Sequence, residues 1–287
     1  MSNFSKEDKI RFVSGVRTAR RARVKNNDIV AAVIGQHTEF LRNKNVTGYI
    51  MACYLDMLRI HRAKSKALTL DILQPIYDNT LKQAEQASVQ DRTLAILDQV
   101  YDYDFEIHNS TGQAIRSARG YFLECALESL FDQLAPEQYF AQVEIRHNLR
   151  KKRIDFVVGI SNLSDPHENV LYVTVKKSLR ERGSQVTDER KFLGDAPLFF
   201  FYADDVKLSE GIMEGFYEDD IVMVCPEYNI ASHYPGKRNV ISYEKFFLEL
   251  LPVYLRDKAN FKITDFGIET DHQRIQRPGF TLVRANA

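Results

Sequence analysis

The fold of this 287-residue chain is decided by residues 153–176, which read RIDFVVGISNLSDPHENVLYVTVK. Both ends of this stretch are runs of β-branched and aromatic residues, a composition typical of buried strands. The segment between them is rich in Asn, Ser and Asp and contains a proline, and these residues favour turns. The stretch therefore predicts an antiparallel hairpin that brings Asp155 and Lys176 to the same end.

The rest of the chain predicts a mixed α/β fold, an α+β mixed sheet, around this hairpin. Short apolar runs predict strands at 155–160, 170–175, 197–202 and 221–225, and helices are expected at 122–134, 178–192 and 243–258. From residue 6 to about residue 86, apolar residues recur at three- and four-residue spacing, which predicts helices. We expect a helical N-terminal domain at 1–90 and a second domain, built on the sheet, at 91–287.

The charge composition sums to zero, with 39 Lys and Arg against 39 Asp and Glu, and 44% of the residues are hydrophobic. A folded chain is expected, but the total charge by itself points neither to nucleic acid nor to any other class of partner. The distribution is uneven, because basic residues cluster before and within the predicted hairpin region and near the N-terminus: Arg17, Arg20, Arg21, Arg23 and Lys25; Arg146, Arg150, Lys151, Lys152 and Arg153; Lys176, Lys177, Arg180 and Arg182. A neutral total is thus compatible with a basic face.

Several other classes of site are excluded. Cys53, Cys125 and Cys225 form no CxxC pair, which argues against a disulfide framework or a zinc site. Neither Gly-rich phosphate-binding motif, GxxxxGK[ST] or GxGxxG, occurs. Apolar runs such as 198–203 are too short to span a bilayer, and residues 1–6 lack the apolar core of a secretory signal. We expect a cytoplasmic protein with no membrane partner.

The predicted hairpin joins a carboxylate to a cation. Mg²⁺ prefers carboxylate oxygens, and an ammonium group beside it can orient an attacking water and neutralise charge on a phosphate. Asp155 and Lys176 alone are weak support for such a Mg²⁺ site, since charged pairs of this kind are common in α/β proteins. The following helix adds a second acid, Glu189, which lies seven residues after Arg182 and so shares its helix face.

The triplet Arg180-Glu181-Arg182 stands between Lys176 and Glu189. Arginine fits the O6 and N7 atoms of guanine in the major groove, and a carboxylate accepts a hydrogen bond from N4 of cytosine. The triplet can therefore read G·C pairs. Taken alone, it is also compatible with a charged helix start that holds its own ion pairs.

Together these residues resemble a family. Asp155, Lys176, the spacing to Arg180-Glu181-Arg182, and Glu189 are similar to Type II restriction endonucleases that cut sites with a CCGG or CCNGG core, a branch of the PD-(D/E)xK nucleases. In that branch the second acid lies on the following helix, and its usual place here holds Thr174. The resemblance covers about residues 115–195. Ile154 replaces the proline of the motif name, and Gly183 stands where a bulky residue is expected.

The resemblance implies that the domain at 91–287 is catalytic and that the helical domain at 1–90 serves dimerisation or DNA binding. Each of the residues above then has an implied role. Asp155 and Glu189 bind Mg²⁺, Lys176 is the catalytic lysine, and Arg180, Glu181 and Arg182 read double-stranded DNA. It also implies an upstream helical glutamate near the metal, for which Glu124 is the candidate and Glu128, one turn later, is its rival. Because one site cuts one strand, cutting both strands of a palindrome calls for a homodimer or a higher oligomer.

Two other functions remain open. Helices expected at 28–41 and 47–58 follow the N-terminal basic cluster and could form a helix-turn-helix, as in a DNA-binding regulator without catalysis. A repair or structure-specific nuclease would share the acid–lysine core without reading bases.

Overall fold

A computed structural model describes residues 6–83, 85–147, 150–164, 170–176, 183–193, 198–203, 205–269 and 281–284. The chain forms two compact units. Unit 1 comprises Met1–Ile34 and Cys53–Phe122, and unit 2 comprises Gly35–Ala52 and Leu123–Ala287. None of the described helices combines the length and the apolar character that a membrane span requires.

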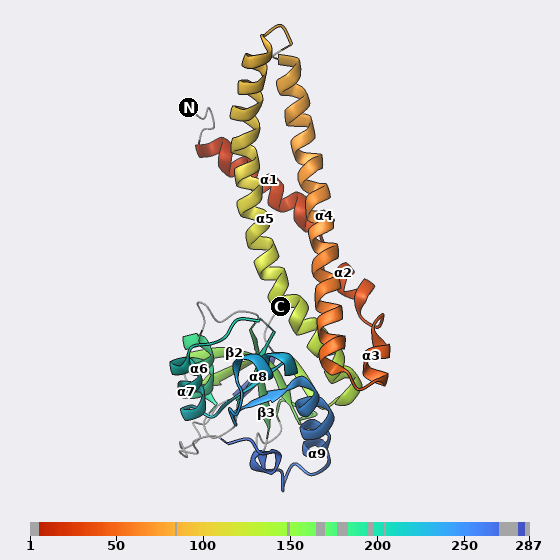
Figure 1. The fold of residues 1–287 in the computed structure, drawn as a ribbon, viewed down its shortest axis with the longest axis vertical. Helices are drawn as coiled ribbons and strands as arrows, with labels where there is room; N and C mark the ends of the chain where they lie inside the picture. The colour runs from red at the N-terminus through yellow and green to blue at the C-terminus, as the bar shows by residue number, and fades with distance from the viewer. Residues whose placement is uncertain are drawn as a thin grey trace. The chain divides into compact units, whose positions relative to one another are not determined.

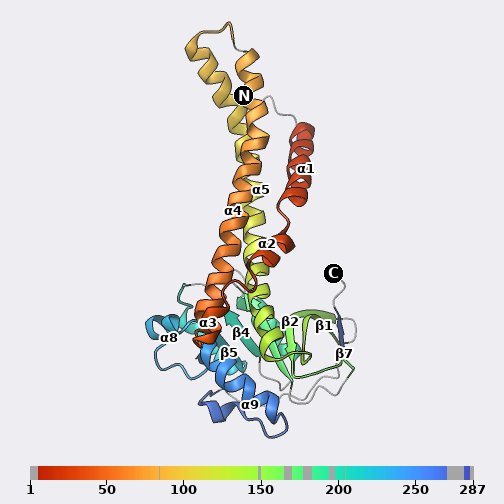
Figure 2. The same ribbon diagram turned by 90° about the vertical axis from the view of Figure 1, so that its right-hand side faces the viewer.

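Unit 1 is helical, as expected for the N-terminal part of the chain. It contains α1 (Lys6–Arg23), α2 (Asn26–Val33) and most of two long helices, α4 (Val46–Gln83) and α5 (Val89–Leu134). Figures 1 and 2 show α4 and α5 running side by side in opposite directions. The expected helix at 47–58 is therefore only the beginning of a 38-residue helix, and the stretch 28–41 contains most of α2 and part of α3 (Thr38–Arg42).

Part of the N-terminal basic cluster packs inside unit 1. Arg20 is only 9% exposed, and its guanidinium donates to the carbonyl oxygen of Ser110 at 2.9 Å, to the Ser110 hydroxyl at 2.8 Å and to the Thr111 hydroxyl at 2.7 Å. Arg23 pairs with Asp71 at 2.6 Å. The hydrogen bonds of Arg20 offset part of the cost of burying its guanidinium, whose Nε has no partner among the described residues. Arg20 thus ties α1 to α5, and its buried side chain does not contribute to a basic face.

Unit 2 is built on one mixed sheet of seven strands within the described residues, in the order β6-β5-β4-β3-β2-β1-β7. The strands are β1 (Tyr139–His147), β2 (Arg150–Val158), β3 (Leu171–Lys176), β4 (Leu198–Tyr202), β5 (Ile221–Cys225), β6 (Val240–Ser242) and β7 (Thr281–Arg284). Strands β7, β1, β2 and β3 pair antiparallel, and β3 to β6 pair parallel. The predicted antiparallel hairpin of β2 and β3 is confirmed, as is the mixed α/β fold.

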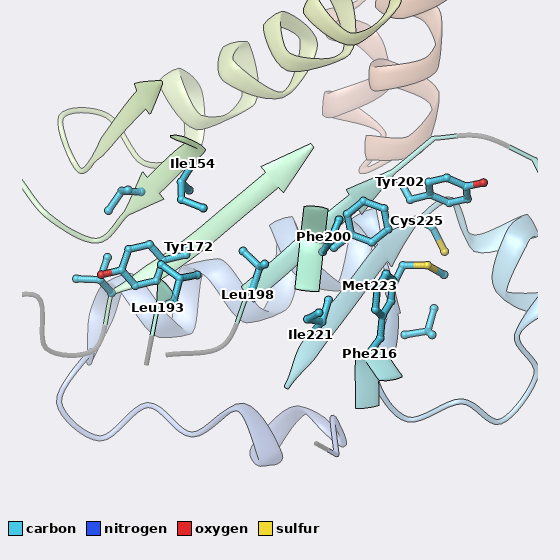
Figure 3. Close-up of a cluster of buried hydrophobic side chains, with 14 of the residues drawn as sticks. Ile154, Tyr172, Leu193, Leu198, Phe200, Tyr202, Phe216, Ile221, Met223 and Cys225 are labelled. Atoms are coloured by element: carbon cyan, nitrogen blue, oxygen red, sulfur yellow. The ribbon is translucent and has the colours of Figure 1, made fainter. Parts of the chain in front are cut away.

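Helices cover both faces of this sheet (Figure 1). The elements of unit 2 besides the strands are α3, the C-terminal part of α5, α6 (Gly183–Phe192), α7 (Glu210–Glu218), α8 (Glu227–His233), the π-helix η1 (Lys245–Leu250), α9 (Leu251–Arg256) and the 3₁₀ helix η2 (Ile263–Phe266). On one face, Leu193, which directly follows α6, and Phe216 of α7 join an apolar cluster with sheet residues such as Phe200 (Figure 3). On the other face, Phe131 of α5 and Phe246 of η1 contact each other and pack against the sheet.

The alternation of β4 explains why two layers of helices are needed. Every residue of this strand is buried, and its successive side chains point to opposite faces. Phe200 packs in the cluster with α7, whereas Phe199 and Phe201 contact Phe246. The sheet is therefore a buried central layer, which fixes the ends of β2 and β3 rigidly.

Candidate active site

Asp155 lies on β2 and faces the end of β3. It is 8% exposed, and its Oδ2 atom accepts hydrogen bonds from the backbone N–H of Val175 at 2.6 Å, the Thr174 hydroxyl at 3.2 Å and Lys176 Nζ at 3.3 Å. These three donors belong to consecutive residues of β3 and fix the carboxylate in one orientation. The prediction that the hairpin brings Asp155 and Lys176 together is confirmed by this geometry.

Lys176 is the cation at the centre of the site, with only 12% of its side chain exposed. Its Nζ atom donates to the Thr174 hydroxyl at 2.8 Å and lies 3.3 Å from Asp155 Oδ2 and 3.5 Å from Glu189 Oε1. Burial opposes the charged form, but the surrounding carboxylates outweigh burial and raise the pKa of Lys176. The side chain is therefore an ammonium ion at neutral pH.

Glu189 reaches the same ammonium from α6, with 9% of its side chain exposed. Burial raises the pKa of Glu189, and the positive charge of Lys176 offsets this shift in part. Its second oxygen, Oε2, is buried and has no hydrogen-bond partner among the described residues. A buried carboxylate oxygen without a donor is costly, so this atom is poised to accept a ligand.

The rotation of α6 is fixed by a buried ion pair next to Glu189. Arg190 NH2 lies 3.0 Å from Asp220 Oδ2, and the two side chains are only 4% and 10% exposed. Val186 and Leu193 of the same segment pack into the apolar cluster. Because adjacent residues on a helix are about 100° apart, holding Arg190 in the interior also fixes the direction of Glu189.

The structure separates the two upstream glutamates of α5. Burial and the negative charge of Asp155 raise the pKa of Glu124 to about 7, against the opposing effects of Lys176, Gln142 and Arg153. Burial and the charge of Asp132 raise the pKa of Glu128. Glu124 is thus electrostatically linked to the Asp155–Lys176 pair, whereas the charge that acts on Glu128 comes from elsewhere.

The acids of the site fit a hard divalent cation such as Mg²⁺. All three hydrogen bonds to Asp155 described above fall on Oδ2, and Glu189 Oε2 is buried without a partner in the described part of the chain. Among the same residues no group of three or more His, Cys, Asp or Glu side chains forms a ready-made metal site. Mg²⁺ usually retains several waters and takes only one or two carboxylates, so two acids suffice.

The triplet that the sequence predicts to read DNA is not among the residues that the structure describes. Arg180, Glu181 and Arg182 lie outside the described residues, as does Lys177 of the same basic cluster. Glu189, seven residues after Arg182, is the first of the predicted residues after Lys176 that the structure places. The role of the triplet therefore stays a prediction.

Sequence reasoning missed two residues that contact the site. Thr174, identified only as the residue in the usual place of the second acid, bonds both Asp155 and Lys176. Gln142 of β1 donates from Nε2 to Glu124 Oε2 at 2.7 Å. The buried, alternating Val143 and Ile145 are a signal that would have predicted strand β1 and so placed Gln142 beside the hairpin.

Comparison with known proteins identifies the fold. No family model matches the chain, and no curated protein matches it. Two solved structures of metal-depleted Ecl18kI, in complex with uncleaved DNA and with uncleaved, modified DNA, each share 20% identity with the chain at a TM-score of 0.71. They cover 90% of this chain, and 89% and 88% of their own.

A third solved structure extends this likeness. The restriction endonuclease PspGI in complex with substrate DNA shares 12% identity at a TM-score of 0.54, over 83% of this chain and 96% of its own. The chain therefore has the fold of a restriction endonuclease, with Asp155, Lys176 and Glu189 gathered on its central sheet and on the helix that follows β3.

Proposed function

We propose that the chain is a type II restriction endonuclease, which cleaves double-stranded DNA at a short palindromic site with a CCGG or CCNGG core. The observation that carries the proposal is the ammonium of Lys176, held within 3.5 Å of both Asp155 and Glu189 on a restriction-endonuclease fold. The solved structures with this fold are complexes with DNA, which supports DNA as the substrate.

In the proposed mechanism, Asp155 and Glu189 hold Mg²⁺. The bound cation supplies Lewis acidity to the attacked phosphate and lowers the pKa of water. Lys176, fixed by Thr174, orients the attacking water and neutralises charge that develops on the phosphate oxygens. Glu124 supports the site directly or through a water. Attack on phosphorus then leaves a 5′-phosphate and a 3′-hydroxyl.

Specificity is assigned to the triplet. Arg180 and Arg182 each face a guanine, and Glu181 accepts from cytosine on the paired strand. One active site cuts one strand, so the enzyme acts as a homodimer whose two-fold axis matches the palindrome.

Incubation of the purified protein with long DNA and Mg²⁺ tests the proposal. We expect discrete fragments, and sequencing their ends gives the site and the cut position. Fragments without fixed ends would indicate a nuclease that does not read bases. DNA that is bound but left intact would indicate a regulator without catalysis, and either result contradicts the proposal.

The two glutamates of α5 provide a matched pair of variants. Glu124→Gln is expected to lower the cleavage rate about 10- to 100-fold, because residues that support a metal site contribute on this scale. Glu128→Gln is expected to retain the wild-type rate within about twofold, because the charge of Asp132 rather than Asp155 acts on it. Single-turnover cleavage rates at saturating Mg²⁺ check both; equal losses would contradict the assignment of Glu124.

The base-reading role of the triplet is tested by Arg182→Ala. A good bidentate contact with guanine contributes about 1–3 kcal/mol of discrimination, so binding to cognate DNA should weaken by that amount. Binding to random DNA should change much less. Titrations of both DNAs with the variant, at one fixed salt concentration, measure the difference. Equal weakening on both would make Arg182 a phosphate contact.

A further inference from the structure

Gln142 has a strained backbone beside the candidate active site. Its φ of +54° lies in the left-handed region, which non-glycine residues rarely adopt, although it sits within strand β1. The pairing of Ala141 with Phe156 and of Val143 with Ile154 places Gln142 directly opposite Asp155. Strain of this kind persists where the surrounding structure over-determines it, and it concentrates at functional sites.

The strain coincides with a change of face in both strands. Phe140 and Val143 pack in the same apolar cluster, although regular alternation would send residues three apart to opposite faces. Across the pair, Ile154 and Val157 likewise share that cluster, whereas Phe156 packs against Phe131 on the other face. The irregularity lies between these residues, at the level of Gln142 and Asp155.

Only one of the two polar atoms of the Gln142 side chain has a hydrogen-bond partner among the described residues. Its Nε2 donates to Glu124 Oε2 at 2.7 Å, so its Oε1 is the remaining acceptor of the amide. Oε1 is buried and has no hydrogen-bond partner in the part of the chain that the structure describes. Burying an amide oxygen without a donor is unfavourable, and a water molecule is the usual donor at such positions.

We propose that Gln142 is a positioning residue of the active site. Its amide N–H group holds the Glu124 carboxylate near Asp155, and its carbonyl oxygen accepts a hydrogen bond from a water molecule of the hydrated Mg²⁺. The left-handed backbone is what turns the side chain towards the site from a strand that otherwise packs in the core. This inference rests on the proposed function, because it assumes that Asp155 and Glu189 bind the cation.

Two variants separate the amide from the backbone strain. Gln142→Met keeps the approximate length of the side chain and removes the amide, while Gln142→Gly also removes the amide but relieves the positive φ. Glu137→Gly is the control, because Glu137 has a φ of +59° in an exposed turn before β1. Asp155→Asn serves as the reference for loss of a metal ligand.

The first readout is the rise in melting temperature on titration with Mg²⁺ alone, without DNA. The second is the Mg²⁺ concentration for half-maximal cleavage. For both Gln142 variants we expect metal affinity and requirement to worsen about 10- to 100-fold, the range found when partners of metal ligands are removed. DNA affinity without Mg²⁺ should stay unchanged, and Glu137→Gly should match the wild type in every readout.

The possible outcomes distinguish the inference from the proposed function. If the wild type cleaves DNA and Gln142→Gly binds Mg²⁺ as the wild type does, the positioning role is wrong while the proposed function stands. If the wild type neither responds to Mg²⁺ nor cleaves, the proposed function fails and the inference fails with it. If Gln142→Met weakens Mg²⁺ binding but Gln142→Gly binds Mg²⁺ as the wild type does, the loss comes from packing of the methionine. That result also overturns the inference.

Discussion

Replacing Lys176 by alanine is expected to reduce DNA cleavage by at least about 10²–10³-fold, the usual cost of removing one preorganised group that stabilises charge in a transition state. The ammonium lies within 3.5 Å of both Asp155 and Glu189, and its raised pKa keeps it charged. Its removal leaves two buried carboxylates without their shared cation.

The same variant separates catalysis from recognition. Specific binding to cognate DNA should persist, because the residues assigned to base reading are untouched. Lys176→Met retains the bulk of the side chain and covers the case in which the alanine variant is poorly folded. Lys207→Ala is the control, since Lys207 is 55% exposed and its ion pair with Glu210 lies at the surface. Single-turnover assays measure the cleavage rate, and gel-shift assays measure binding to cognate DNA. If a folded Lys176 variant still cleaves DNA, Lys176 is not part of the mechanism.

The core of the candidate site was predictable because its signals are local in sequence. Residues 153–176 contain two apolar runs and a turn, and that pattern alone sets the pairing of β2 with β3. The helical periodicity after Lys176 then brings Glu189 back to the ammonium. Each step depends on the spacing at which side chains return to one face, two residues in a strand and 3.6 in a helix. This spacing can be read from the sequence itself.

The missed residues depend on relations that no local pattern encodes. Gln142 contacts the site only because β1 pairs with β2 in one register and because its φ is positive. The pairing of Arg190 with Asp220 joins a residue of α6 to one 30 positions later, in the turn before β5. Likewise, α5 runs without a break from Val89 to Leu134 and contributes residues to both compact units, a division that no local pattern marks. Tertiary packing, rather than propensity, decides such features.

Replacing Gly159 by alanine is expected to destabilise the fold more than any other glycine substitution in the described residues. Gly159 directly follows β2, four residues after Asp155, and has a φ of +101°. A Cβ atom there would lie 1.7 Å from Tyr254 Oη and 2.6 Å from its Cζ. Overpacking costs about 1–3 kcal/mol and strained backbone about 1–3 kcal/mol, so we expect a loss of about 2–6 kcal/mol.

Tyr254 cannot move away without further loss. It is fully buried, and its hydroxyl donates to the carbonyl oxygen of Val158 at 3.0 Å, while Lys258 donates to the carbonyl oxygen of Gly159 at 2.7 Å. The close approach of α9 to this backbone therefore requires a glycine, and it also fixes the end of the strand that carries Asp155. An alanine here should lower both the melting temperature and the cleavage rate of the surviving folded protein.

Gly236→Ala isolates the backbone contribution, because Gly236 has a φ of +74° and open space around its Cβ position. It should cost only about 1–3 kcal/mol, the strain alone. Urea unfolding of both variants measures the difference. If Gly159→Ala were no more destabilising than Gly236→Ala, the contact with Tyr254 would be adaptable, and α9 would not be what holds β2, and with it Asp155, in place.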